Sequence, residues 1–161
     1  MTNENENIGS ATAREFLLGV IDNTDFVSVA INAASNLSAV PLGSNDIWLS
    51  PSQINSFING SVNVDNRTLG WGMTFMHELN HTQVGGGLRD TPGNPGPLVS
   101  QMNIIRFELN TLGGNYGQRL DYQASGIGGN AYLPFNVPAK QSTILWIPPS
   151  RVRSDHKYVR F

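Results

Sequence analysis

Residues 70–84, which read GWGMTFMHELNHTQV, decide the fold that we expect for this chain. The segment contains no proline and its apolar residues recur at helical spacing, so we predict a helix. A helix this apolar is normally buried inside a domain. The glycine run at 85–87 ends it. The expected apolar stripe comprises Trp71, Phe75 and Leu79, widened by Met73 and Met76.

A polar triplet interrupts this helix, because His77 and His81 stand four positions apart and Glu78 follows the first histidine. Residues i and i+4 lie on one face of a helix, so both imidazoles can reach one zinc ion at about 2.0–2.1 Å. Glu78 lies roughly 100° around the helix from His77. We therefore expect Glu78 to flank the metal as a base that takes a proton from a zinc-bound water.

Composition excludes several other classes of protein. The net charge is −2 and charged residues make up only 14%, which gives no basic excess for binding nucleic acid. The chain contains no cysteine, so disulfides and thiolate zinc sites are excluded. We also expect no membrane span, since no apolar run is long enough to cross a bilayer.

Around the central helix we expect one domain over residues 10–161, preceded by a flexible tail at 1–9. Ser10 and Ser50 precede apolar segments as N-cap residues, and Pro51 suits a first helical position. The expected helices cover 11–21, 51–58 and 98–112, and the expected strands cover 26–31, 47–49, 62–64 and 143–147. On the helix at 98–112, the expected apolar face comprises Leu98, Met102, Ile105 and Leu109.

The HExxH sequence His77–His81 resembles the signature of the zincin metallopeptidases. Its flanks, together with the later stretch MNIIRFELNTLGG…QRLDY, look like metallopeptidase domains of bacterial toxin-like and secreted proteins. The resemblance covers about residues 68–122 and implies an α+β fold in which a small sheet covers a buried active-site helix. It also implies a catalytic zinc ion held by His77 and His81, with Glu78 as the general base for hydrolysis of peptide bonds.

A catalytic zinc site needs a third protein ligand, for which the sequence offers three candidates. Asp90 follows the glycine run, and Gly87-Leu88-Arg89-Asp90 resembles the Gly-x-x-His/Asp of metzincins. Its distance from His81 is three residues longer than in metzincins, and no Met-turn follows. Glu108, on the next predicted helix, is the gluzincin-style alternative. His156 is the best ligand by type, but it stands in a charged terminal segment where a surface histidine is expected.

Hydrolysis through a tetrahedral oxyanion also benefits from a hydrogen-bond donor, and Tyr122 is our first choice. The other candidates are Tyr116, Tyr132 and Arg119. Carboxylates usually orient zinc-bound histidines, and the available ones are Asp46, Asp65 and Asp121.

The expected partners are a protein or peptide substrate, and an inhibitor or immunity protein if the domain acts as a toxin. Residues 1–7 carry no signal-peptide pattern. The resemblance to secreted and toxin-like domains implies a bacterial domain that is extracytoplasmic or delivered within a larger protein. The alternative function is a non-catalytic, zinc-containing binding domain, which four protein ligands closing the metal shell would favour.

Overall fold

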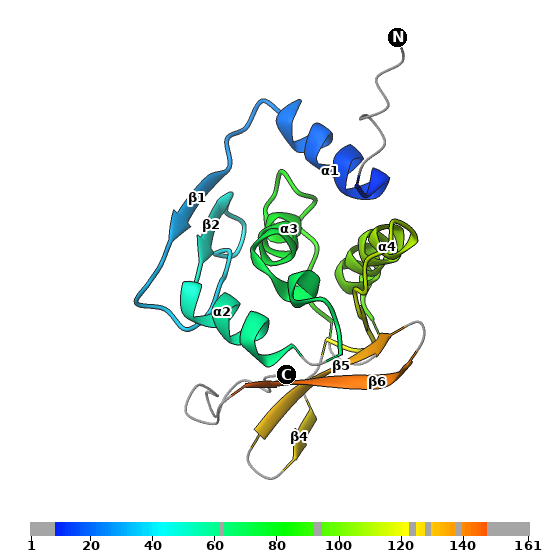
Figure 1. Ribbon diagram of the computed structural model, residues 1–161. Coiled ribbons are helices and arrows are strands. Elements are labelled where there is room, and N and C mark those ends of the chain that lie inside the picture. Colours follow the sequence, from blue (N-terminus) through cyan, green and yellow to red (C-terminus); the bar gives the residue numbers. More distant parts are fainter. Residues whose placement is uncertain are drawn as a thin grey trace.

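The computed structural model describes residues 9–61, 63–91, 95–122, 125–127, 130–137 and 140–147. Helices and strands both contribute, so the fold is mixed α and β, as the sequence predicts. No helix in these ranges is long and apolar enough to cross a membrane. In chain order (Figure 1) the elements are α1 (Ala11–Ile21), β1 (Ser28–Ile31), β2 (Asp46–Leu49), α2 (Pro51–Gly60), the 3-10 helix η2 (Asn66–Leu69), α3 (Trp71–His81), α4 (Pro97–Thr111), β3 (Gln118–Arg119), β4 (Ser125–Ile127), β5 (Asn130–Val137) and β6 (Lys140–Ile147).

Serine caps start the first two helices where the sequence predicts them. The Ser10 hydroxyl accepts a hydrogen bond from the Ala13 amide, and the Ser50 hydroxyl accepts one from the Gln53 amide. Each bond satisfies a backbone donor that the first turn of a helix leaves free. Pro51 occupies the start of α2, where its missing amide hydrogen costs no helical bond.

The first sheet pairs β1 and β2 in parallel, with Ser28 opposite Asp46. The other edge of β2 pairs with Ala39 in an antiparallel bridge to Trp48. Strand β2 buries alternate residues, Ile47 and Leu49, and these pack against α3. A small sheet therefore lies against the predicted central helix.

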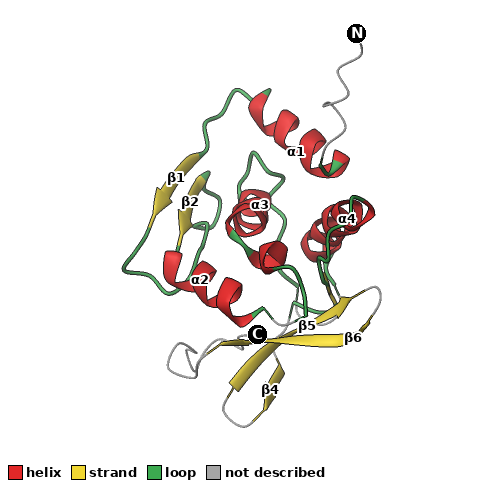
Figure 2. Cartoon of the chain, viewed as in Figure 1, coloured by secondary structure: helices red, strands yellow, loops and turns green. Residues whose placement is uncertain are grey.

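Helix α3 lies at the centre of the molecule, between β2 on one side and α4 on the other (Figure 2). Two apolar clusters hold it there. The first joins Met73 and Met76 of α3 to α4, whose buried residues are Leu98, Met102 and Ile105. The second joins Leu79 of α3 to Ile47, Leu49 and Ile54. The apolar face predicted for α4 is thus confirmed, with Leu109 packed at its edge.

The predicted stripe of α3 is wrong at its first residue, because the Trp71 side chain is 40% exposed. Trp71 is the first residue of the helix, where the chain enters from η2. The helix also ends at His81 rather than at residue 84. There the Thr82 hydroxyl donates to the Leu79 carbonyl and accepts from the Gly85 amide, so the chain turns one residue after His81.

The second sheet has the order β3-β5-β4, with β6 on β5, and all these pairs are antiparallel. Of its strands the sequence predicted only part of β6. Strand β5 escapes prediction because Pro134 lies inside it, and proline normally marks an edge strand or a loop. The strand predicted at 62–64 is wrong for Asn63 and Val64, which form a bend, with Asn63 at a φ of 61°.

Candidate metal centre

His77 and His81 lie one turn apart on the same face of α3, as their spacing predicts. Their rings meet edge to face, with centroids 4.9 Å apart, and their Nε2 atoms are 3.3 Å apart. Both side chains are about one-fifth exposed. The helix therefore brings two imidazole nitrogens to one point at the wall of a cleft.

A backbone carbonyl orients His81. Its Nδ1 lies 2.6 Å from the Leu88 carbonyl oxygen, which can only accept a hydrogen bond, so Nδ1 carries a proton, and Nε2 keeps a lone pair whenever His81 is neutral. The sequence suggested a carboxylate for this role. Two of its candidates are engaged elsewhere, since Asp65 pairs with Arg67 and Asp46 accepts from the Ser44 hydroxyl.

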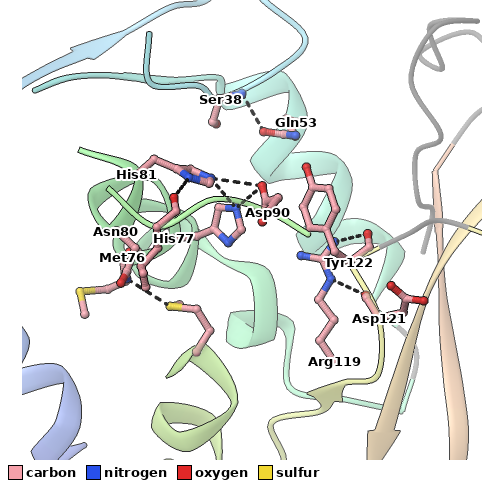
Figure 3. Close-up of polar contacts among 12 residues, drawn as sticks. Ser38, Gln53, Met76, His77, Asn80, His81, Asp90, Arg119, Asp121 and Tyr122 are labelled. Carbon is pink, nitrogen blue, oxygen red and sulfur yellow. Dashed lines mark hydrogen bonds and ion pairs between the residues drawn. The ribbon is translucent and has the colours of Figure 1, made fainter. Parts of the chain in front are cut away.

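Asp90 completes the group, because the loop after α3 folds back over the end of the helix. The Gly87 amide donates to the Thr82 carbonyl and the Leu88 amide to the Asn80 carbonyl. Asp90 Oδ2 then lies 3.4 Å from Nε2 of His77 and 3.2 Å from Nε2 of His81. Among the described residues, these three side chains form the group of metal-ligand type (Figure 3).

The two histidines stabilise the ionised carboxylate of Asp90. Burial alone would raise the pKa of Asp90, but hydrogen bonds and charge from His77 and His81 outweigh it and hold that pKa well below its usual range. For His81, burial alone would lower the pKa. The hydrogen bond to Asp90 and the charge of Asp90 have the larger effect, so the pKa of His81 is raised. The group thus favours an ionised carboxylate facing a positive charge.

The three converging atoms suit a cation. Nε2 of neutral His81 is free to coordinate a metal ion, and Nε2 of His77 and Oδ2 of Asp90 lie close enough to bind the same ion. Asp90 Oδ1 is also buried without a hydrogen-bond partner in the described structure, and such an atom is costly unless a further ligand reaches it. The arrangement can therefore hold a metal ion.

Glu78 adjoins this group without belonging to it. Its side chain is 7% exposed and it lines the same cleft as both histidines. Burial raises the pKa of Glu78. The charges of His77 and His81 lower this pKa and the charge of Asp90 raises it, and the net result is a raised pKa. A carboxylate whose pKa is raised toward neutrality is suited to accept and release protons.

Tyr122 also faces the group, as the sequence analysis proposed. Its ring lies 6.5 Å from the His77 ring and almost parallel to it, with Asp90 between the histidines and the tyrosine in Figure 3. Burial raises the pKa of Tyr122 first, followed by the charge of Asp90, so the phenol stays protonated at neutral pH and can donate a hydrogen bond.

The structure does not bring Glu108 to the group. Its carboxylate accepts hydrogen bonds from the Ser10 hydroxyl and from the amide and hydroxyl of Thr12, so it joins α4 to the start of α1. Glu108 lies on the side of α4 that packs against α1, which removes it as the third ligand. His156 lies outside the described residues.

The other donor candidates differ in position. Tyr116 lies beside a separate groove, where the Arg67 guanidinium covers its ring. Tyr132 belongs to β5, and its side chain is outside the described part. Arg119 lines the cleft of the metal group. The sequence analysis missed two features of the site. The Leu88 carbonyl is a backbone group that no side-chain pattern reveals, and the segment 37–43 forms the opposite wall of the cleft.

Comparison of this chain with protein-family models, with curated proteins and with solved structures finds no match. The case for its function therefore rests on the chemistry and geometry of the site.

Proposed function

We propose that this protein is a zinc-dependent metallopeptidase with a zincin-like arrangement. One observation carries the proposal, namely the triangle of His77 Nε2, His81 Nε2 and Asp90 Oδ2, whose sides are 3.2–3.4 Å. Tetrahedral bonds of 2.0–2.1 Å place neighbouring ligand atoms about 3.3 Å apart. The three atoms thus match three corners of a zinc tetrahedron.

The donor set also favours zinc. Two imidazoles and one carboxylate are zinc ligands, whereas calcium and magnesium take oxygen ligands. The bond from His81 to the Leu88 carbonyl is the outer contact that normally orients a metal-bound histidine. When bound, zinc supplies Lewis-acid polarisation of a carbonyl oxygen and a lowered pKa for water. Three protein ligands would leave one position on a bound zinc ion open, as catalytic zinc sites require.

Glu78 is the proposed general base. Its carboxylate takes a proton from the attacking water and passes it to the nitrogen of the leaving amine. The Glu78 side chain is buried, which restricts its motion, and its raised pKa suits both proton transfers. Tyr122 donates its phenolic hydrogen to the carbonyl oxygen as negative charge develops there.

The cleft wall opposite the histidines favours a peptide as substrate. Ala39 uses its own N–H and C=O to pair with Trp48, while Pro41 keeps Val40 extended. Alternate residues of an extended segment direct these groups to opposite sides, and those of Val40 form no hydrogen bond within the described residues. An extended peptide can add to such an edge through backbone hydrogen bonds.

The test replaces Glu78 with Gln in the zinc-loaded protein. We expect E78Q to bind zinc as the parent does and to lose hydrolysis of an unstructured protein such as casein by about 10²–10⁴-fold, because the amide cannot take the proton. Elemental mass spectrometry and a fluorescent casein assay measure the two quantities. Hydrolysis by E78Q at the parent rate would remove Glu78 as the base.

The cellular setting that we propose follows from the resemblance of the HExxH region. It is a bacterial extracytoplasmic domain, or one delivered within a larger protein, that an inhibitor or immunity protein restrains. Such a partner would cover the cleft that contains Glu78 and the metal group.

A further inference from the structure

Arg119 is a buried cation in the wall of the metal cleft. Arg119 is 8% exposed. It lines the cleft together with His77, His81 and Tyr122. Asn103 on α4 fixes the backbone of Arg119, since its side chain accepts from the Arg119 amide and donates to the Arg119 carbonyl. The position of the arginine is therefore set by the core helix α4.

The guanidinium of Arg119 uses two of its three nitrogens in hydrogen bonds to described residues. Nε donates to the Asp121 carbonyl at 3.0 Å and Nη2 to the Tyr122 carbonyl at 2.8 Å. Nη1 forms no hydrogen bond among the described residues. In Figure 3 the free end of the guanidinium points away from these two carbonyls, toward the side where Asp90 lies.

A second buried arginine uses all three guanidinium nitrogens. Arg106 donates from Nε and Nη2 to the Thr68 carbonyl and from Nη1 to the Asn103 side chain. Arg119 lacks the contact at Nη1, and within the described residues neither arginine has an ion pair with a carboxylate. Burial lowers the pKa of Arg119, and the charges of Tyr122, Asp90 and Asp121 offset only part of that shift, which reflects the cost of keeping the guanidinium charge there. An anion at Nη1 would offset that cost.

The other charges of the cleft point to the same ligand. In the proposed mechanism Asp90 neutralises part of the metal charge, and Glu78 takes up a proton from water and releases it to the leaving amine. The charges not used by that mechanism are positive, namely Arg119 inside the cleft and the exposed Arg89 at its rim. A planar guanidinium with a free edge matches a carboxylate.

We propose that Arg119 anchors a carboxylate group of the peptide substrate, which makes Arg119 a specificity-determining residue. The carboxylate belongs either to the C-terminus of the substrate or to an acidic side chain. The inference rests on the proposed peptidase function, and it deepens that function by defining a class of substrate.

The test measures binding without turnover, using the zinc-loaded E78Q protein and fluorescence anisotropy. Three labelled peptides share one sequence and differ in charge: one ends in a free carboxylate, one in an amide, and one in an amide with an internal Gln replaced by Glu. We expect a carboxylate-bearing peptide to bind about tenfold more tightly than the neutral amide. The peptide that gains affinity identifies the source of the carboxylate.

Variants of Arg119 assign the preference. Adding R119Q should remove the tenfold ratio, and R119K should retain part of it, because lysine keeps the charge but loses the fork. The matched control R89Q removes an exposed cation at the rim of the cleft and should leave the ratio intact. Any effect of R89Q on affinity should be smaller than that of R119Q and should disappear at high salt. A merely structural role for Arg119 would weaken all three peptides equally and leave the ratio unchanged.

Failure of this inference is distinguishable from failure of the peptidase proposal. Cleavage of casein by the parent together with equal binding of all three peptides would overturn the role of Arg119 alone. A preserved preference without cleavage would overturn the peptidase and keep the carboxylate site. If R119Q fails to fold, the ratio measured in the protein with Arg119 intact still decides, and its absence contradicts the proposal.

Discussion

At the scale of single residues, the site depends on which atoms carry protons. The Leu88 carbonyl fixes a proton of His81 on Nδ1, so in neutral His81 it is Nε2 that faces Asp90 and His77 with a lone pair. The HExxH pattern predicts His77, Glu78 and His81 because helix geometry alone places them. Asp90 was one of three alternatives, since the path of the loop that carries it depends on backbone bonds that no residue pattern encodes.

A prediction at this scale concerns Tyr122. Replacing it with Phe keeps the ring that faces His77 and removes only the hydroxyl. We expect Y122F to retain zinc and to lose about 10²-fold in kcat, because one donor to the developing oxyanion is gone. Steady-state kinetics on a fluorogenic peptide checks the rate. A kcat equal to that of the parent would assign Tyr122 to packing.

At the scale of elements, the turn after α3 positions Asp90, the third residue of the candidate metal group. The sequence predicts that the glycines at 85–87 end the helix, but it does not predict that glycine is needed at these positions for different structural reasons. Gly87 takes a φ of 62°, whereas Gly85 is required for space. A Cβ atom at Gly85 would lie only 1.7 Å from the Leu79 carbonyl oxygen, so the loop approaches the helix as closely as a backbone without side chain allows.

The element-scale prediction is therefore that Gly85→Ala displaces the loop that carries Asp90. We expect a loss of about 1–3 kcal/mol in unfolding free energy and weaker zinc retention, since the added methyl group cannot fit without a backbone shift. Gly72→Ala is the matched control, because a Cβ there meets nothing within 4 Å. Chemical denaturation and zinc titration measure both effects. Equal behaviour of the two variants would refute this account of the turn.

At the scale of the whole molecule, α3 is held between two apolar clusters, one shared with α4 and one with β2 and α2. Periodicity predicted most helices and the buried face of α4 because those segments are amphipathic. It missed most of the second sheet, because β3 and β4 are too short to show a pattern and Pro134 hides the strand signal of β5. It also misjudged Trp71, which is the first residue of α3 and is 40% exposed.

The prediction at this scale is that α3 carries much of the stability of the fold. Leu79 is 1% exposed among Ile47, Leu49 and Ile54, so Leu79→Ala should cost about 2–5 kcal/mol of unfolding free energy. The control Ile104→Ala, at a side chain 51% exposed on α4, should change it by no more than about 0.5 kcal/mol. Urea denaturation measures both, and similar losses in the two variants would contradict the central position of α3.

The central claim is that His77, His81 and Asp90 bind one zinc ion. The most direct measurement is the zinc content of the purified protein by elemental mass spectrometry, with Asp90→Ala and Glu108→Ala as a matched pair of carboxylate deletions. The account predicts about one zinc ion per chain in the parent and in E108A, and its loss in D90A. Full zinc retention by D90A, or no zinc in the parent after reloading, would contradict it.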